Sequence, residues 1–360
     1  MTSLWSRMGL AFAVAGLAQV GASASIQVAQ PAPAAPIVRP VPPPRAPIYL
    51  RDRIDALGRQ FNGRVGIAVK SVNEGWSTGW RDDDLYPQQS VSKLWVAITA
   101  LDAVDKGRVS LNQRVTLTRA DLTLFHQPVA AKILGGGATM SLSELMYQAI
   151  TKSDNTCNDK LMRSVGGPAA VRAMIAEKGL GQIRFYDGER ALQSKIAGLL
   201  WSQSYSVGNA FSAARNALPY SVRKSSFDRY VADPYDGASP TAIVNALARL
   251  KRGELLSPAS TARLLSVMGN TKTGANRLKG GLKPGWSLSH KTGTGQVLGP
   301  VQAGYNDIGV LTAPDGRSYA VAVMIKRTST PLSTRMTLMN NVVRAVINQH
   351  EMAHGTAYAL

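Results

Sequence analysis

Three short groups of residues carry side chains suited to acyl-transfer chemistry, and the first is Ser90-Val91-Ser92-Lys93. A serine and a lysine three residues apart lie on the same face of a helix, so the Lys93 amine is expected beside the Ser90 hydroxyl, where it can act as a base. The start of a helix also favours the negative charge of a developing oxyanion. Because S-x-x-K occurs by chance in many proteins, this group alone does not establish an activity.

The other two groups complement the first. In Ser153-Asp154-Asn155, a hydroxyl and an amide can shuttle a proton and hold a substrate amide. In Lys291-Thr292-Gly293-Thr294, a cation and two hydroxyls can anchor a substrate carboxylate along a strand. Taken singly, Ser153-Asp154-Asn155 also fits an ordinary polar loop or helix cap, and Lys291-Thr292-Gly293-Thr294 fits a turn with exposed charge.

The helices that position these groups are indicated by apolar periodicity and caps. The stretch from Ser90 to Lys106 is apolar almost all round, which predicts a helix buried at the centre of a domain. Ser141 to Glu144 form a capping box that opens a helix through Ile150. Further helices are predicted at about 50–61, 168–178, 241–252 and from 257 onward, and a closing helix is capped near Ser333.

Strands are predicted at both ends of this helical block. They are expected at 64–72, 286–290, 307–312 and 319–325, with Asp315-Gly316 as the turn of a hairpin. The simplest packing joins the two chain ends into one layer of sheet and helices and leaves the middle as an all-helical subdomain. We therefore predict an α/β (α+β) fold, with an α/β part at 48–88 and 254–350 and a helical part at 89–253.

The N-terminus has the features of an export signal. Arg7 precedes an apolar run from Met8 to Val20, and Ala22 and Ala24 give the small-x-small pattern of a cleavage site. We predict a signal peptide at 1–24, a Pro/Ala-rich linker at 25–47, a catalytic domain at 48–350 and a C-terminal tail at 351–360. The apolar run is too short to span a bilayer, so we expect a periplasmic or secreted protein without a transmembrane segment; a buried N-terminal helix is the alternative.

Composition excludes a chain that is mostly disordered. A hydrophobic fraction of 45% supports a sizeable core, and Cys157 is the only cysteine, so no internal disulfide can form. The formal charge of +19, or +18 without Arg7, suits anionic envelope polymers such as peptidoglycan, although a merely solvated basic surface explains it equally well. No nucleic-acid-binding motif is recognisable, so nucleic acid is not an expected partner.

In the order S-x-x-K, S-D-N, K-T-G, the three groups are jointly specific. With them the sequence resembles the class A serine β-lactamases from about Ile48 to His350. The likeness also includes Pro87-Gln88-Gln89, Met268 to Thr271 and Tyr305 to Ile308.

The resemblance implies an antiparallel sheet flanked by the N- and C-terminal helices, and a covalent two-step hydrolysis of a small β-lactam. It implies that Ser90 is the nucleophile, that Lys93 is its base or part of a relay, and that Ser153 passes a proton to the lactam nitrogen. Asn155 would hold the acylamide, and Lys291, Thr292, Gly293 and Thr294 would bind the carboxylate and complete the oxyanion hole. Phe125 or His126 would wall the cleft.

The resemblance also implies a glutamate that activates the water for deacylation. The candidate is Glu189, 36 residues after Ser153, with Gln193 as a second water ligand. The residues before Glu189 lack the family's usual Arg/Asp bracing pattern. About thirty extra residues between Lys195 and Pro240 carry several aromatic side chains, which could reshape the cleft or pack on its rim; these include Trp201, Tyr205, Phe211, Tyr220, Phe227 and Tyr230. A surface or salt-bridged Glu189 is the alternative.

Two other functions remain open. A D-alanyl-D-alanine peptidase or esterase on the same scaffold would deacylate slowly, and an envelope-binding protein would use the charge and the linker without needing Ser90. We expect a monomer with no metal or cofactor. The histidines are scattered along the chain, and His350 and His354 fall in a stretch expected to fray.

Overall fold

A computed structural model describes residue 21 and residues 44–355. The predicted signal peptide, apart from residue 21, the linker up to residue 43 and the tail from residue 356 lie outside the described residues. Ala46, predicted to belong to the linker, is buried against the core, so the packed part of the chain begins slightly before residue 48.

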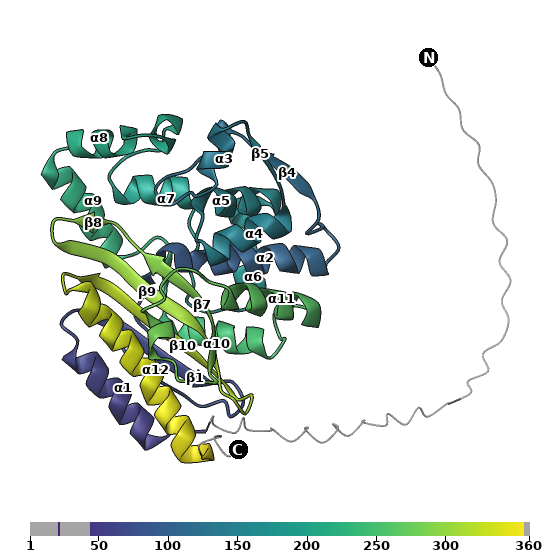
Figure 1. Cartoon of the computed structure of the whole chain (residues 1–360), viewed down its shortest axis with the longest axis vertical. Coiled ribbons are helices and arrows are strands. Elements are labelled where there is room, and N and C mark those ends of the chain that lie inside the picture. Colours follow the sequence, from purple (N-terminus) through teal and green to yellow (C-terminus); the bar gives the residue numbers. More distant parts are fainter. Residues whose placement is uncertain (1–20, 22–43, 356–360) are drawn as a thin grey trace. The chain divides into compact units, whose positions relative to one another are not determined.

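An antiparallel sheet of six strands organises the domain, with the strand order β2-β1-β10-β9-β7 and with β8 paired to β9 (Figure 1). The predicted strands are confirmed, and those near the C-terminus are longer than expected. Gly316 lies in the turn between β9 and β10 with a φ of 88°, which a glycine adopts without steric cost. The strands are β1 (Arg64–Ser71), β2 (Ser77–Trp80), β7 (Ser287–Thr294), β8 (Val297–Leu298), β9 (Val301–Thr312) and β10 (Ser318–Thr328).

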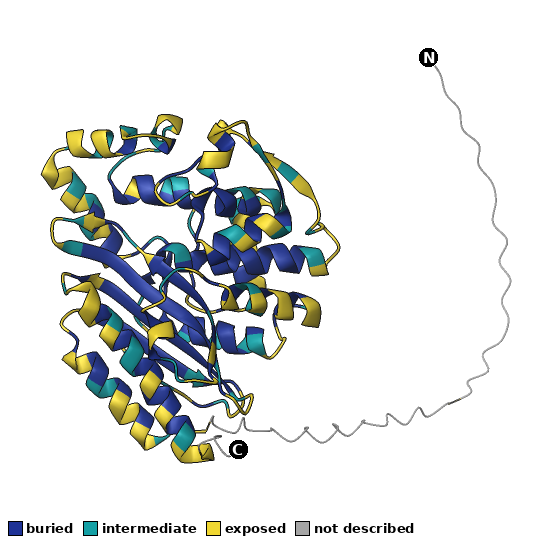
Figure 2. Cartoon of the chain, viewed as in Figure 1, coloured by how far each residue is buried: buried dark blue, intermediate teal, exposed yellow. Residues whose placement is uncertain are grey.

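Each face of the sheet is covered by helices, as the alternation of side chains along a strand requires. On β1, Val65, Ile67 and Val69 point to the face covered by α1 (Ile48–Gln60) and α12 (Leu332–His354), whereas Ala68 belongs to the core on the other face. In Figure 2, α1 and α12 turn their buried residues to the sheet and their exposed residues outward.

The C-terminal helix differs from the prediction. Helix α12 begins after Pro331, which provides no side-chain cap, and not at Ser333. It continues to His354, so residues 351–354 are helical and not part of a tail. His350 is buried, packs edge-on against Trp286 and hydrogen-bonds the Tyr319 hydroxyl at 2.9 Å, so this end of the helix is held by packing.

The other face of the sheet joins the helical part. Helices α10 (Pro240–Lys251) and α11 (Pro258–Gly269) pack on the sheet, and α2 (Lys93–Asp105) is buried nearly all round, as predicted. The predicted boundary at residue 253 is therefore wrong, because α10 contacts β1, β9 and β10 and belongs to the sheet layer.

The middle of the chain is not entirely helical, contrary to the prediction. Short strands β4 (Arg114–Leu117) and β5 (Ala138–Ser141) pair with each other, and β3 (Tyr86–Pro87) pairs with β6 (Gly237–Ala238). Ser141 and Glu144 form the predicted capping box of α4 (Leu142–Thr151). The remaining helices are α3 (Ala130–Leu134), α5 (Asn155–Ser164), α6 (Gly167–Glu177), α7 (Glu189–Ile196), α8 (Ala210–Ala217) and α9 (Tyr220–Ala232), with 3-10 turns η1 (Gln89–Ser92), η2 (Arg119–Asp121), η3 (Gln203–Ser206) and η4 (Leu278–Gly281).

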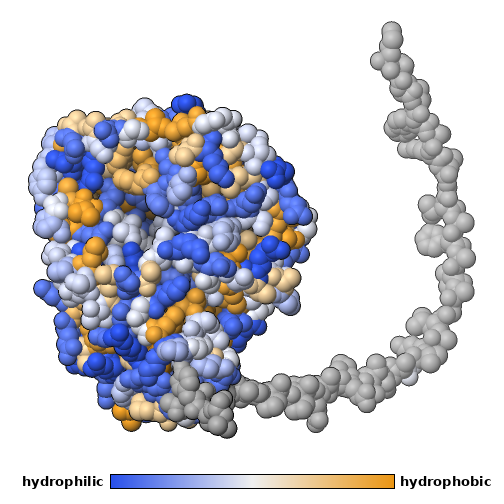
Figure 3. Space-filling model, in the orientation of Figure 1, coloured by the Kyte–Doolittle hydropathy of each residue, from blue (hydrophilic) through white to orange (hydrophobic). Residues whose placement is uncertain are grey.

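Hydrophilic and hydrophobic residues are interspersed over the face shown in Figure 3. Over the described residues, none of the helices combines the length and apolar character that crossing a bilayer requires.

Candidate active site

A cavity of about 170 Å³ brings parts of all three sequence groups together. Lys93 and Lys291 are fully buried. Lys93 donates to Asn155, which lines the cavity, and Lys291 donates to Ser153, the neighbour of Asp154 and Asn155 in the second group. The cavity is lined by Ser90, Phe125, His126, Asn155, Glu189, Gln193, Thr294, Gly295 and Gln296.

Ser90 lies in the 3-10 turn η1, which passes directly into α2 at Lys93. The preceding residue, Gln89, has a φ of 54°, which is uncommon outside glycine. Ser153 and Phe125 also have positive φ angles, of 59° and 58°. Three of the four non-glycine residues with such angles in the described part of the chain thus lie at or beside the cavity, and backbone strain of this kind concentrates at functional sites.

The Lys93 amine contacts two other catalytic candidates, Ser153 and Glu189. Its Nζ donates to the backbone oxygen of Ser153 at 2.7 Å and to Ser153 Oγ at 3.3 Å, and it also donates to Asn155 Oδ1. It forms an ion pair with Glu189 Oε1 at 3.3 Å. Because both groups are almost completely buried, this pair is little screened by solvent.

Ser153 Oγ lies between two amines. Lys291 Nζ donates to it at 3.0 Å, and Lys93 Nζ donates to it at 3.3 Å. Since both amines donate, the hydroxyl hydrogen of Ser153 remains available for a substrate atom. Burial, together with the nearby charge of Lys93, lowers the pKa of Lys291 well below its usual value.

Strand β7 carries the third group. Thr292 Oγ1 hydrogen-bonds Thr273 Oγ1 at 2.7 Å, whereas Thr294 lines the cavity and accepts a hydrogen bond from Arg277. A Cβ on Gly293 would overlap the backbone oxygen of Gln88, so this glycine lets β7 lie directly against η1. The glycine therefore fixes the separation between Thr294 and the turn that holds Ser90.

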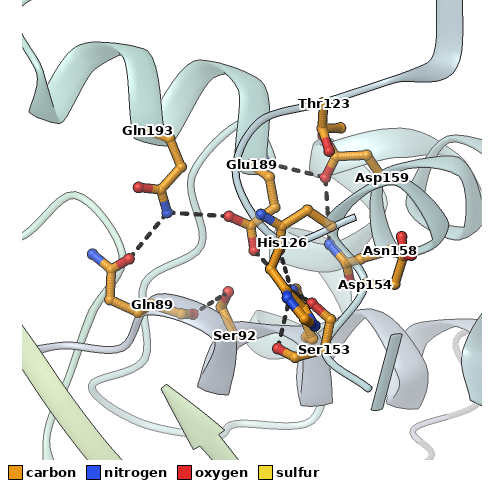
Figure 4. Close-up of polar contacts among 12 residues, drawn as sticks. Gln89, Ser92, Thr123, His126, Ser153, Asp154, Asn158, Asp159, Glu189 and Gln193 are labelled. Carbon is orange, nitrogen blue, oxygen red and sulfur yellow. Dashed lines mark hydrogen bonds and ion pairs between the residues drawn. The ribbon is translucent and has the colours of Figure 1, made fainter. Parts of the chain in front are cut away.

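Glu189 opens α7 and is turned into the cavity (Figure 4). Its backbone N–H donates to Asp159 Oδ1 at 3.0 Å, and Gln193 Nε2 donates to its Oε2 at 3.1 Å. Asp159 is completely buried, and burial, with the nearby charge of Glu189, raises its pKa to about 6. Glu189 is therefore held at its backbone by Asp159 and at its carboxylate by Lys93 and Gln193.

A second buried network lies behind Gln193. Gln193 Nε2 also donates to Gln89 Oε1 at 3.0 Å, and Gln89 Nε2 donates to the Tyr230 hydroxyl at 2.5 Å. That hydroxyl donates to Asp236 Oδ1 at 2.9 Å, while Asp236 Oδ2 accepts the backbone N–H of Gln89 at 2.7 Å. Tyr230 belongs to the segment 196–239, which the sequence suggested as an insertion, so this segment contributes to the wall behind the cavity.

Aromatic residues of the same segment meet the cavity mouth. Phe125 and His126 both line the cavity, which agrees with the expectation that one of them walls the cleft. Phe125 is 52% exposed and packs edge-on against Phe211 of α8, with 5.1 Å between ring centroids.

Four residues at the site were not singled out from the sequence: Asp159, Asp236, Arg277 and Gln296. Each acts through a partner distant in the chain, and none stands in a recognisable motif. In the described residues, no three His, Cys, Asp or Glu side chains are grouped so as to hold a metal ion.

Comparison with known proteins agrees with this geometry. The model of the family described as the β-lactamase enzyme family matches residues 49–350. The extended-spectrum β-lactamase PER-1 of Pseudomonas aeruginosa is 27% identical over 82% of this chain and 85% of its own length, and β-lactamase VEB-1 of the same organism is 24% identical over 83% and 89%.

The solved structure of a β-lactamase from Chitinophaga pinensis is 28% identical, covers 83% of this chain and 98% of its own, and superposes with a TM-score of 0.69. The α/β fold inferred from the sequence is therefore confirmed. The family match spans most of the chain, and the chain belongs to the β-lactamase enzyme family, within its class A serine group.

Proposed function

We propose that this chain, a β-lactam-hydrolysing member of the class A family, opens the lactam ring through an acyl-enzyme on Ser90, which water activated by Glu189 then releases. The observation that carries the proposal is the position of Lys93. Its amine contacts Ser153 Oγ and Glu189 Oε1 at the same time. One buried amine thus connects the hydroxyl suited to the leaving nitrogen with the carboxylate suited to water.

In the acylation half, Lys93 acts as a neutral amine: the Ser90 oxygen attacks the lactam carbonyl carbon, and the Ser90 proton passes to Lys93 Nζ. The lactam C–N bond breaks, and the nitrogen takes a proton from Ser153. The amines that donate to Ser153 Oγ then return a proton to it. The backbone N–H groups of Ser90 and Thr294 stabilise the oxyanion, at about 3 kcal/mol for each donor.

Lys291 and Thr294 are the carboxylate anchors in this proposal. A substrate carboxylate brought beside Lys291 favours its charged form, and so opposes the lowering of its pKa by burial. Arg277 holds the Thr294 hydroxyl from the other side and adds positive charge. Asn155 donates from Nδ2 to the Leu124 oxygen, which fixes its carboxamide at the wall where a substrate acylamide would lie.

In the deacylation half, Glu189 accepts a proton from water as the water oxygen attacks the ester carbonyl on Ser90. The C–O bond to Ser90 then breaks, and the Ser90 oxygen regains a proton from Lys93. General-base catalysis of this kind contributes roughly 10²- to 10⁴-fold to a rate. The residues before Glu189 depart from the family's Arg/Asp pattern, but Arg172 pairs with Asp187 of the same loop at 3.0 Å. Glu189 itself is held by Asp159, Lys93 and Gln193.

The test is intact mass spectrometry of the protein mixed with a penicillin and sampled over time. Wild type should turn over substrate and show little adduct, Ser90→Ala should show neither, and Glu189→Gln should accumulate an adduct on Ser90. A wild-type adduct that persists would indicate a slowly deacylating peptidase or esterase instead. An adduct that Glu189→Gln releases at the wild-type rate would exclude Glu189 as the base.

We also propose that the mature protein is exported and acts as a monomer on small β-lactams, and that its basic surface contacts anionic envelope polymers. The N-terminal pattern around Arg7 supports export, and the formal charge supports contact with anionic polymers. N-terminal sequencing of the mature protein and salt-dependent pelleting with peptidoglycan test them.

A further inference from the structure

Tyr230 is a buried phenol outside the three catalytic groups. It lies on α9 in the segment 196–239, has no exposed surface and packs among Leu192, Ile196 and Phe227. A phenol in such a place needs partners for its hydroxyl, because an unsatisfied buried polar group is costly. It has two: Gln89 on one side and Asp236 on the other.

The direction of these hydrogen bonds is determined by Asp236. Burial raises the pKa of Asp236 to about 6, so at about pH 8 it is ionised and can only accept. Its Oδ2 accepts the Gln89 backbone N–H, and its Oδ1 accepts the Tyr230 hydrogen. The phenol oxygen must then accept from Gln89, which requires the amide nitrogen of Gln89 to face Tyr230.

This orientation extends to Glu189. With Nε2 of Gln89 directed at Tyr230, its Oε1 faces Gln193 and accepts from Gln193 Nε2. Gln193 Nε2 also donates to Glu189 Oε2, while Gln193 Oε1 accepts from Gln296 Nε2 at 3.0 Å. Figure 4 shows Gln193 between Gln89 and Glu189. Reversing the Gln89 amide would place two N–H₂ groups against each other and favour a reversed Gln193.

We propose that Tyr230 is a positioning residue for deacylation: its hydroxyl fixes the amide orientations of Gln89 and Gln193, and so keeps an N–H donor on Glu189 Oε2. The inference rests on the proposed role of Glu189 as the base. It assigns to the segment 196–239 a direct effect on hydrolysis of the acyl-enzyme. Acylation does not depend on this donor, because Lys93 and Ser153 make no contact with Tyr230 in the network.

The first test variant is Tyr230→Phe, which keeps the ring and removes the hydroxyl. The second, Asp236→Asn, reverses the network: the asparagine oxygen takes the Gln89 N–H, and its N–H₂ group faces Tyr230. The phenol must then donate to Gln89, whose amide has to turn. Tyr235→Phe is the matched control, because the Tyr235 ring packs at a tilt against Tyr230, with 5.9 Å between ring centroids, and lies outside the hydrogen-bond network described above.

The rates of acylation and deacylation by a penicillin are measured separately at about pH 8, by rapid-quench mass spectrometry, with Glu189→Gln in parallel. Tyr230→Phe and Asp236→Asn should acylate at close to the wild-type rate and deacylate about tenfold more slowly, which matches loss of a hydrogen bond to a charged group. Tyr235→Phe should match wild type in both steps. The fraction of protein that acylates reports whether each variant is folded.

The inference is overturned if Glu189→Gln accumulates adduct while Tyr230→Phe deacylates normally. It is also overturned if Tyr230→Phe lowers both rates equally in protein that acylates fully, since that is the result of a merely structural role. Normal deacylation by Glu189→Gln would instead contradict the proposed function, and the inference would fail with it. The Glu189→Gln arm therefore separates the two failures.

Discussion

Replacing Asp159 by asparagine should change how the stability of the fold depends on pH. Asp159 is completely buried, and its pKa is raised from 3.8 to about 6, first by burial and then by the charge of Glu189. The native state therefore holds the proton more tightly than the unfolded chain. Between these two pKa values the free energy of unfolding falls as pH rises, because the native protein must give up a proton that the unfolded chain has already lost.

The magnitude follows from the two pKa values. The penalty of ionising Asp159 is small at low pH, and it grows by about 2 kcal/mol between about pH 4.5 and about pH 8. Asp159→Asn removes this titration, while its side-chain oxygen can still accept the Glu189 N–H. The weaker contact with the Arg190 N–H, at 3.5 Å, is lost at every pH and does not alter the difference.

The assay is urea denaturation of both proteins at the two pH values, followed by tryptophan fluorescence. The stability of Asp159→Asn relative to wild type should rise by about 2 kcal/mol from about pH 4.5 to about pH 8. The raised pKa of Asp236 also contributes to the slope, but it is present in both proteins and cancels. A relative stability that is the same at both pH values would refute the reasoning.

Two further results are expected. Gly293→Ala should slow acylation at least tenfold, because the new methyl group overlaps the Gln88 oxygen and forces β7 away from Ser90; stopped-flow acylation measures this rate. Gly269→Ala, whose new Cβ would lie 3.7 Å from its nearest neighbour, is the control and should acylate normally. Cys157 should react with a thiol reagent only after denaturation, since it is fully buried and burial raises its pKa; rapid labelling of native protein would contradict this.

Much of the fold could be predicted from local patterns in the sequence. The capping box at Ser141 and the apolar helix after Ser90 depend on neighbouring residues, and both are found as predicted. The start of α12 was predicted near Ser333 because the residue that precedes the helix, Pro331, provides no side-chain cap that the sequence could reveal. Helix α10 was assigned to the wrong layer because periodicity reports which face is buried but not what covers it.

The residues of the candidate site also fall into two groups, those that a local motif marks and those that it does not. Ser90, Ser153 and Lys291 belong to short motifs and could be named from the sequence. Asp159 could not, because it supports Glu189 across 30 residues of chain and stands among ordinary helical residues. Asp236 likewise reaches Gln89 from 147 residues away. Such supporting contacts exist only once the chain has folded, so no local signal marks them.

The strand order has a consequence for how the chain folds during synthesis. Strand β1, near the N-terminus, lies between β2 and β10, and β10 is made almost last. The turn that carries Ser90 packs on β7 and β9, which are also made late. A growing chain therefore cannot complete its sheet or its catalytic centre until nearly all of it has left the ribosome. The central strands of the sheet and the catalytic centre are therefore completed together, in the last stage of synthesis.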